Sequence, residues 1–134
     1  MAMESVQFFD LSQEIREDSR GFSFYPLIGR VQVPDKLPEA FHLVSIGPGQ
    51  VRGNHLHPGR WEWLYPFHGT GYFMWEPHPG DLRERMVSSR RLLIRIPPGV
   101  PHALRNPGPE PLYLLAWREG ETDPAEDTVP YLLG

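Results

Sequence analysis

The sequence predicts an all-β fold, a small antiparallel β-barrel, on three observations. First, the 134 residues include 16 prolines and 13 glycines, and proline is excluded from helix interiors and central strands, so the elements must be short and joined by many turns. Second, short apolar runs recur at close spacing, each followed by proline or glycine. Third, no segment carries a long amphipathic helical pattern. Closure into a barrel would remove the exposed edges of such strands.

The first expected strands lie between residues 41 and 67. Residues 41–46 form a β-type run closed by Gly47-Pro48-Gly49, and residues 51–57 form a second extended stretch closed by Pro58-Gly59. In residues 61–67 aromatic side chains occupy every second position, which is the strand period, so they share the face opposite Glu62 and Leu64. The aromatic row consists of Trp61, Trp63, Tyr65 and Phe67.

The remaining expected strands are shorter and are separated by turn signals. Gly69-Thr70-Gly71 turns the chain, and we expect residues 72–75 to pair back on residues 61–67 as a hairpin. Further strands are expected at residues 82–87, 92–96 and 112–117.

The length indicates a single domain over residues 1–134, since compact domains cluster near this size. We expect its core at about 38–118, N-terminal strands within 5–33 and an acidic tail over 119–134. Residues 119–127 are acidic and poor in apolar side chains, which is typical of a loop or loosely held tail. Residues 129–133 are apolar again, and we expect them to dock on their own domain, with a partner subunit as the alternative.

Composition argues against several classes of partner. The net charge of −4 gives no basic footprint for nucleic acid or an anionic membrane. No apolar run approaches the length that spans a bilayer, and the N-terminus has no secretory signal pattern, so we expect a cytoplasmic protein that acts on a small molecule. Without cysteine, any metal must be held by histidine and carboxylate.

Four side chains from two distant stretches form a candidate metal site. His55 and His57 are two residues apart, so on a strand both imidazoles point to the same side. Glu62 follows a Pro-Gly turn, where the next strand can bring its carboxylate beside them, and a cation is the natural partner of a carboxylate that faces a barrel interior. His102 follows a rigid turn rich in proline. Three imidazoles and one carboxylate suit a divalent transition metal, such as Zn, Fe, Mn or Ni.

The sequence resembles the cupin family at two motifs. The first is glycine, five residues, His-x-His, three or four residues, glutamate, six residues and glycine; the second is glycine, five residues, Pro-x-Gly, two residues, histidine, three residues and asparagine. The first motif is met by Gly49, His55, His57, Glu62 and Gly69. The second is met by Pro97, Gly99, His102 and Asn106, while Arg91 replaces its leading glycine. The resemblance implies a jelly-roll barrel (a double-stranded β-helix) whose metal ligands point inward.

An inward-pointing Glu62 places the aromatic row outside the barrel. There the rings must be covered by N-terminal strands or by a second subunit, and we expect a homodimer. The alternative, rings that face the pocket, would suggest an apolar or ring-stacking ligand. His42, His68 and His78 match no motif, and we assign them to surface or hydrogen-bonding positions, with the pocket border as an alternative for His68.

A narrower resemblance points to the sugar-nucleotide cupins, which include dTDP-sugar epimerases and ketoisomerases. Asp18-Ser19-Arg20-Gly21-Phe22 and Val51-Arg52-Gly53-Asn54-His55 look like segments of those enzymes. The resemblance implies that Arg52 binds the nucleotide diphosphate and that His55 acts as a base. A guanidinium forks onto phosphate, and an imidazole titrates near neutrality, so both roles are chemically reasonable.

The metal and acid–base interpretations compete for the same histidines. A metal-bound histidine has committed its lone pair and cannot also remove a proton. The ketoisomerases with this double histidine generally lack a carboxylate at the position of Glu62, whereas some zinc-bearing cupins of capsular sugar biosynthesis retain it, so Glu62 favours metal. A different residue must then be the base; without metal, His55 and His57 are the catalytic candidates.

Three functions therefore stay open. The first is a metal-dependent enzyme that epimerises or isomerises a small polar substrate such as a keto-sugar nucleotide. The second is a mononuclear Fe or Mn dioxygenase, because three histidines and one glutamate leave two positions on an octahedral ion. The third is a non-catalytic metal- or ligand-binding module, because a shared fold does not fix a shared function.

Overall fold

The structure is a computed structural model that describes residues 5–23, 39–88, 91–119 and 128–133. In these ranges the regular elements are all strands, and no helix there is long and apolar enough to cross a bilayer. In chain order the strands are β1 (Gln7–Asp10), β2 (Arg16–Asp18), β3 (Gly21–Ser23), β4 (Glu39–Ile46), β5 (Val51–Leu56), β6 (Trp61–His68), β7 (Thr70–Trp75), β8 (Arg83–Ser88), β9 (Leu92–Ile96), β10 (His102–Arg105), β11 (Leu112–Glu119) and β12 (Val129–Pro130).

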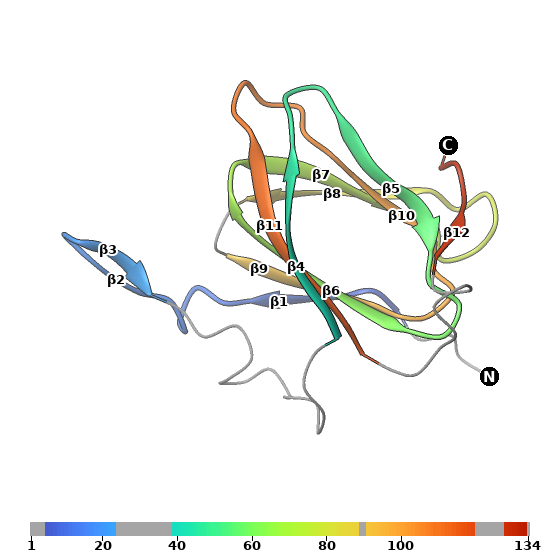
Figure 1. The fold of residues 1–134 in the computed structure, drawn as a ribbon, viewed down its shortest axis with the longest axis horizontal. Helices are drawn as coiled ribbons and strands as arrows, with labels where there is room; N and C mark the ends of the chain where they lie inside the picture. The colour runs from blue at the N-terminus through green and yellow to red at the C-terminus, as the bar shows by residue number, and fades with distance from the viewer. Residues whose placement is uncertain (1–4, 24–38, 89–90, 120–127, 134) are drawn as a thin grey trace.

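Two five-stranded antiparallel sheets face each other and enclose the interior (Figure 1). Sheet I has the order β1-β9-β6-β11-β4, and sheet II has the order β12-β5-β10-β7-β8. β2 and β3 form a separate hairpin that projects from the barrel (Figure 1). The expected all-β, antiparallel barrel is therefore confirmed.

The expected strands between residues 41 and 117 all occur, as β4 to β9 and β11, with ends that differ by at most two residues. β10 was not expected, because its four residues lie between Pro101 and the turn that begins at Asn106 and are too few to show a period. Docking of the C-terminal apolar segment is confirmed: β12 pairs with β5 through Val129 and Leu56. The acidic residues 120–127 and the N-terminal residues 24–33 lie outside the described ranges.

The expected hairpin between residues 61–67 and 72–75 is wrong. β6 belongs to sheet I, whereas β7 belongs to sheet II and pairs with β8 and β10. The chain crosses between the sheets at Gly69, which has φ of 90° and lies against the start of β11. An added Cβ there would be 2.9 Å from the Pro111 carbonyl oxygen. Sequence patterns identified both segments as strands, but such local patterns do not show which other strand each one pairs with.

Apolar side chains cover both faces of sheet I. The inner cluster, between the sheets, includes Ile46, Leu64, Phe73, Ile94, Ile96, Leu104, Leu112 and Leu114. The outer cluster consists of Leu11, Trp63, Tyr65, Leu93 and Trp117. Phe9 of β1 stacks on Trp63 with ring centroids 5.8 Å apart. The aromatic row therefore lies outside the barrel as expected, and the N-terminal segment of the same chain buries Trp63 and Tyr65.

Candidate metal centre

The four predicted ligands converge in the interior from both sheets. His55 lies on β5, His57 follows the end of that strand, and His102 is the first residue of β10, so all three belong to the side of sheet II. Glu62 lies on β6 of sheet I. One ligand atom from each side chain can be chosen so that all four lie within 4.8 Å of one another.

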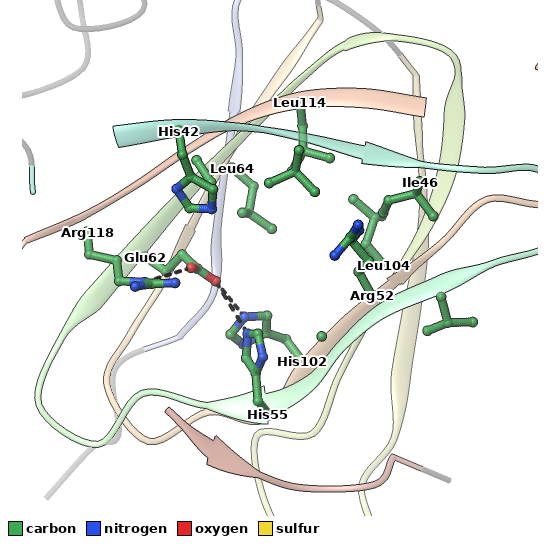
Figure 2. A pocket seen from close by; sticks show the side chains of 14 residues that line it. His42, Ile46, Arg52, His55, Glu62, Leu64, His102, Leu104, Leu114 and Arg118 are labelled. Atoms are coloured by element: carbon green, nitrogen blue, oxygen red, sulfur yellow. Dashed lines mark hydrogen bonds and ion pairs between the residues drawn. The ribbon is translucent and has the colours of Figure 1, made fainter. Parts of the chain in front are cut away.

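The Glu62 carboxylate is the centre of the cluster (Figure 2). Its Oε1 lies 2.7 Å from His102 Nε2 and 4.0 Å from His55 Nε2, and its Oε2 lies 3.2 Å from His57 Nε2. Glu62, His57 and His102 are buried, whereas the His55 side chain is 25% exposed. Three of the four ligands are therefore shielded from solvent, and the cluster is accessible to solvent at His55.

Glu62 stays ionised despite its burial. Burial alone would raise the pKa of its carboxyl group, but the hydrogen bond with His102 and the nearby imidazoles of His55 and His57 outweigh this effect and hold the pKa well below its usual value. The carboxylate therefore carries a full negative charge near neutral pH and can receive a cation.

Backbone and side-chain partners orient two of the imidazoles. His102 Nδ1 lies 3.0 Å from the Val100 carbonyl oxygen. A carbonyl only accepts, so Nδ1 carries a proton and Nε2 is the atom that faces the cluster. His57 Nδ1 lies 3.4 Å from Thr128 Oγ1, just before β12, while its Nε2 faces Glu62. Partners of this kind fix which ring nitrogen is available to a metal.

The donor set fits a transition metal ion. Three imidazole nitrogens and one carboxylate oxygen are borderline ligands that first-row metals accept and that Mg²⁺ and Ca²⁺ do not favour. Donors that share one ion at about 2.1 Å lie at most about 4.2 Å apart, so the spread of 4.8 Å closes onto an ion with side-chain shifts of a few tenths of an ångström.

An irregularity in β5 determines the direction in which Arg52 and His55 point. Gly53 has φ of 102° and Asn54 has φ of 55°, and the register with β10 shifts beside them. In a regular strand Arg52 and His55, three residues apart, would face opposite sides. The bulge places both of them on the same cavity, as such irregularities do near functional sites.

The cluster opens into a cavity of about 420 Å³ between the sheets, a volume typical of small-molecule sites. One part of its wall is apolar and includes Val44, Ile46, Leu104 and Leu114. The polar part consists of His42, Arg52, His55, Glu62, His102 and Arg118 (Figure 2).

Two arginines flank the cavity. Arg118 of β11 donates from Nε to Glu62 Oε2 at 3.2 Å, and the two residues are paired across the strands. Arg52 donates from Nε to the Ser45 carbonyl oxygen at 2.8 Å, which holds its guanidinium over the cavity (Figure 2). Two fixed guanidinium groups give the cavity the chemistry of an anion-binding site.

Among the histidines outside the motifs, His42 is exposed and hydrogen-bonds to the Ala40 carbonyl, as expected, and it also lines the cavity, which was not expected. His68 does not line this cavity; it is exposed, lies 3.6 Å from Glu110 Oε2 and packs on Tyr113. His78 is also exposed. The segment that contains Asp18 and Arg20 forms the β2–β3 hairpin, away from the cavity.

Arg118 and His42 are the site residues that sequence reasoning missed. Arg118 lies one residue beyond the predicted end of its strand. His42 has the same parity as Ile46 in the predicted strand 41–46, and this was the available signal for an inward position.

The family's sequence profile, described as Cupin domain, matches residues 42–118, which is more than half of the chain. The chain belongs to the cupin family. This cupin has no match among the curated proteins.

Solved structures resemble this cupin over most of its length. A mutant of the 3,4-ketoisomerase QdtA from Thermoanaerobacterium thermosaccharolyticum, in complex with TDP-4-keto-6-deoxyglucose, has a TM-score of 0.75 and 15% identity, covering 96% of this chain and 88% of that one. ChmJ, a 3'-monoepimerase from Streptomyces bikiniensis in complex with dTDP-quinovose, has a TM-score of 0.73 and 17% identity, covering 94% and 69%. At these identities the likeness shows the fold.

A third structure is closer in sequence. The capsular polysaccharide assembling protein CapF from Staphylococcus aureus is 28% identical, with a TM-score of 0.62. The match covers 87% of this cupin but 37% of CapF. This cupin therefore corresponds to about a third of that longer protein.

Proposed function

We propose that this cupin is a metal-dependent enzyme that epimerises or isomerises a keto-sugar nucleotide. The observation that carries the proposal is a cluster of three histidines and Glu62 that opens into a cavity flanked by Arg52 and Arg118. The arginines supply charge for a diphosphate, and the cavity volume suits a small polar substrate. The sugar nucleotides bound to QdtA and ChmJ support this substrate class.

His55, His57, Glu62 and His102 would hold one divalent transition metal ion, such as Zn, Fe, Mn or Ni. When bound, the ion would supply Lewis acidity that polarises a substrate carbonyl. Arg52 would bind the diphosphate at the mouth of the cavity. Arg118, which donates to Glu62 Oε2, would fix that carboxylate and add positive charge beside the substrate oxygen.

Metal binding is tested by elemental analysis of protein purified without added metal, together with His57→Ala and Glu62→Gln. Wild type should carry about one transition metal ion per chain, and both variants should lose most of it, since each removes a ligand. Glu84→Gln, an exposed carboxylate on β8, is the matched control and should keep the metal. If wild type carries no stoichiometric metal, the metal assignment is contradicted, and His55 and His57 become the candidates for acid–base catalysis.

Substrate turnover is tested with TDP-4-keto-6-deoxyglucose, by following product formation with NMR. Conversion by wild type and its loss in Arg52→Gln, with metal content unchanged, would support the assignment. Absence of any conversion by the metal-loaded protein would contradict it.

The donor set also supports a second enzyme class. Three histidines and one glutamate on an octahedral ion leave two positions for substrate and oxygen, as a mononuclear iron or manganese dioxygenase needs. Oxygen consumption by the iron-loaded protein separates the two activities. A site that binds metal and sugar nucleotide but shows neither activity would indicate a ligand-binding module.

We also propose a homodimer. β4 is an edge strand of sheet I, and Leu43 on its outer face is 71% exposed, next to exposed Phe41 and Tyr113. Such apolar side chains are typical of an interface. Light scattering should give twice the chain mass for wild type and the single-chain mass for Leu43→Glu.

A further inference from the structure

The proposed reaction needs a side chain that takes a proton from the substrate, and this side chain must line the cavity. Six titratable side chains of the described residues line the cavity: His42, Arg52, His55, Glu62, His102 and Arg118. His55, Glu62 and His102 would be committed to the metal, and arginine stays protonated in proteins. His42 is the group that remains.

Strand geometry points His42 at the cluster. On β4 the side chains of His42, Val44 and Ile46 alternate onto the inner face, where Val44 and Ile46 pack in the inner cluster. Figure 2 shows the ring of His42 at the wall of the cavity, on the side of Glu62 and Arg118, and the residue is exposed to solvent.

The register leaves room for a substrate between His42 and the cluster. His42 pairs with Ala116, and Ala116 pairs with Leu64, two residues after Glu62 on β6. Two strand spacings separate β4 from β6 by roughly 10 Å. Ala116 lies on β11, between these two strands, and adds only a methyl group to the cavity wall. The part of the cavity next to Ala116 therefore stays open.

The hydrogen bond of His42 sets its tautomer. Nδ1 lies 2.5 Å from the carbonyl oxygen of Ala40. A carbonyl accepts only, so Nδ1 carries the proton, and Nε2 of the neutral ring keeps a lone pair. Ala40 has φ of 53°, in the left-handed region that alanine rarely adopts. An unusual backbone conformation thus occurs at the residue that holds this ring.

We propose that His42 is the general base of this cupin and acts through Nε2, an assignment that rests on the proposed function. Nε2 takes the proton from the carbon next to the substrate carbonyl. The electrons of the broken C–H bond form a C=C bond, and the carbonyl π electrons move to the oxygen, giving an enediolate. For isomerisation, His42 returns the proton to the neighbouring carbon on the same face, and the hydroxyl proton of the first carbon passes to the oxygen of the second. For epimerisation, a water molecule protonates the carbon on the opposite face, and His42 releases its proton to solvent. Neither route needs an oxidant or reductant.

The test measures deuterium incorporation from D₂O into TDP-4-keto-6-deoxyglucose by metal-loaded protein, using NMR. His42→Asn keeps an N–H donor for the Ala40 carbonyl but has no basic nitrogen, so it should lower the exchange rate by at least 100-fold, in the range of general-base contributions. His68→Asn, at an exposed histidine outside the cavity, should stay within about twofold of wild type.

Metal content and TDP affinity, measured by elemental analysis and calorimetry, should not change in His42→Asn, because a base contributes to the chemical step and not to either binding event. Exchange by His42→Asn within threefold of wild type would overturn the assignment and leave the proposed function intact. Loss of metal or of TDP binding in this variant would also overturn it, by indicating a structural role. Absence of exchange in metal-loaded wild type would overturn the proposed function and the base together.

Discussion

Asn106 shows how one buried side chain joins several loops. Its amide nitrogen donates to the carbonyl oxygens of Ile46 and Glu110, at 2.9 and 2.7 Å, and its oxygen accepts from the Gly108 amide at 2.9 Å. Its backbone also exchanges hydrogen bonds with Gly49 and Gln50. The last residue of the second cupin motif therefore ties the end of β4 to the turn before β11.

Asn106→Asp should destabilise the protein by about 2–4 kcal/mol, since a carboxylate cannot donate to two carbonyls and buried polar groups would lose their partners. Urea unfolding followed by fluorescence measures the change. Gln50→Ala, at an exposed side chain in the same region, should alter the free energy of unfolding by less than about 0.5 kcal/mol. An aspartate variant as stable as wild type would show that these bonds contribute little.

At the scale of residues, the sequence predicted side chains that belong to a motif and missed those that meet through register. His55, His57, Glu62 and His102 were found from spacing and resemblance, and they converge in the structure. Arg118 reaches Glu62 only because β11 pairs with β6 in one register. Register between distant strands depends on the packing of the whole sheet, which the periodicity of a single strand does not specify.

The bulge in β5 depends on glycine. A Cβ at Gly53 would lie 2.8 Å from the His102 carbonyl oxygen and 2.9 Å from Ala103 Cα, both in the adjacent strand. The two strands can thus approach closely only if position 53 lacks a side chain, and this approach sets His55 beside His102.

Gly53→Ala should force β5 away from β10 and lower metal affinity by about 10- to 100-fold, as loss of ligand orientation does. Competition with a fluorescent chelator measures the affinity. Gly80→Ala is the matched control, because Gly80 also has positive φ but an added Cβ meets nothing within 4 Å. Equal affinity in the two variants would refute the role of the close approach.

Several hydrogen bonds hold the C-terminal segment, and the one made by the Tyr131 hydroxyl has a defined pH response. Tyr131 donates its hydroxyl to Glu76 Oε1 at 2.9 Å, and this hydrogen bond to a carboxylate raises the tyrosine pKa. A raised pKa stabilises the folded state below the unfolded value of about 10, and the contribution disappears as pH rises through the folded value.

Wild type should therefore be more stable than Tyr131→Phe at neutral pH, and the difference should shrink above about pH 10. Thermal unfolding of both proteins between neutral pH and pH 11 measures this trend. A difference that stays constant across that range would show that the hydroxyl contact does not contribute.

At the scale of elements, the existence of strands was predictable and their partners were not. Prolines, glycines and alternating apolar residues marked seven strands, because these signals are local. The four-residue β10 escaped detection, although it lies between β5 and β7 in the centre of sheet II. The crossing at Gly69 resembled a hairpin turn, since a turn signal does not show which sheet the next strand joins.

Across the whole molecule, the candidate metal ligands belong to different sheets: three histidines on the side of sheet II and Glu62 on sheet I. A bound ion would therefore connect the two halves of the barrel. Such a ligand binds the folded chain and stabilises it by mass action.

Removal of metal by EDTA should lower the melting temperature of wild type by roughly 10 °C, which corresponds to a few kcal/mol for a domain of this size. Differential scanning calorimetry measures the shift. Glu62→Gln should melt at the same temperature with and without chelator. A wild-type transition insensitive to both chelator and added metal would contradict a metal that bridges the sheets.

The two apolar clusters on sheet I have a consequence for mutational tolerance. Because the central strands of this sheet are covered on both faces, few of their positions can accept a polar substitution. In sheet II, the side chains of β8 are mostly exposed and are freer to vary. Random mutagenesis should therefore find tolerated polar substitutions more often on β8 than on the central strands of sheet I.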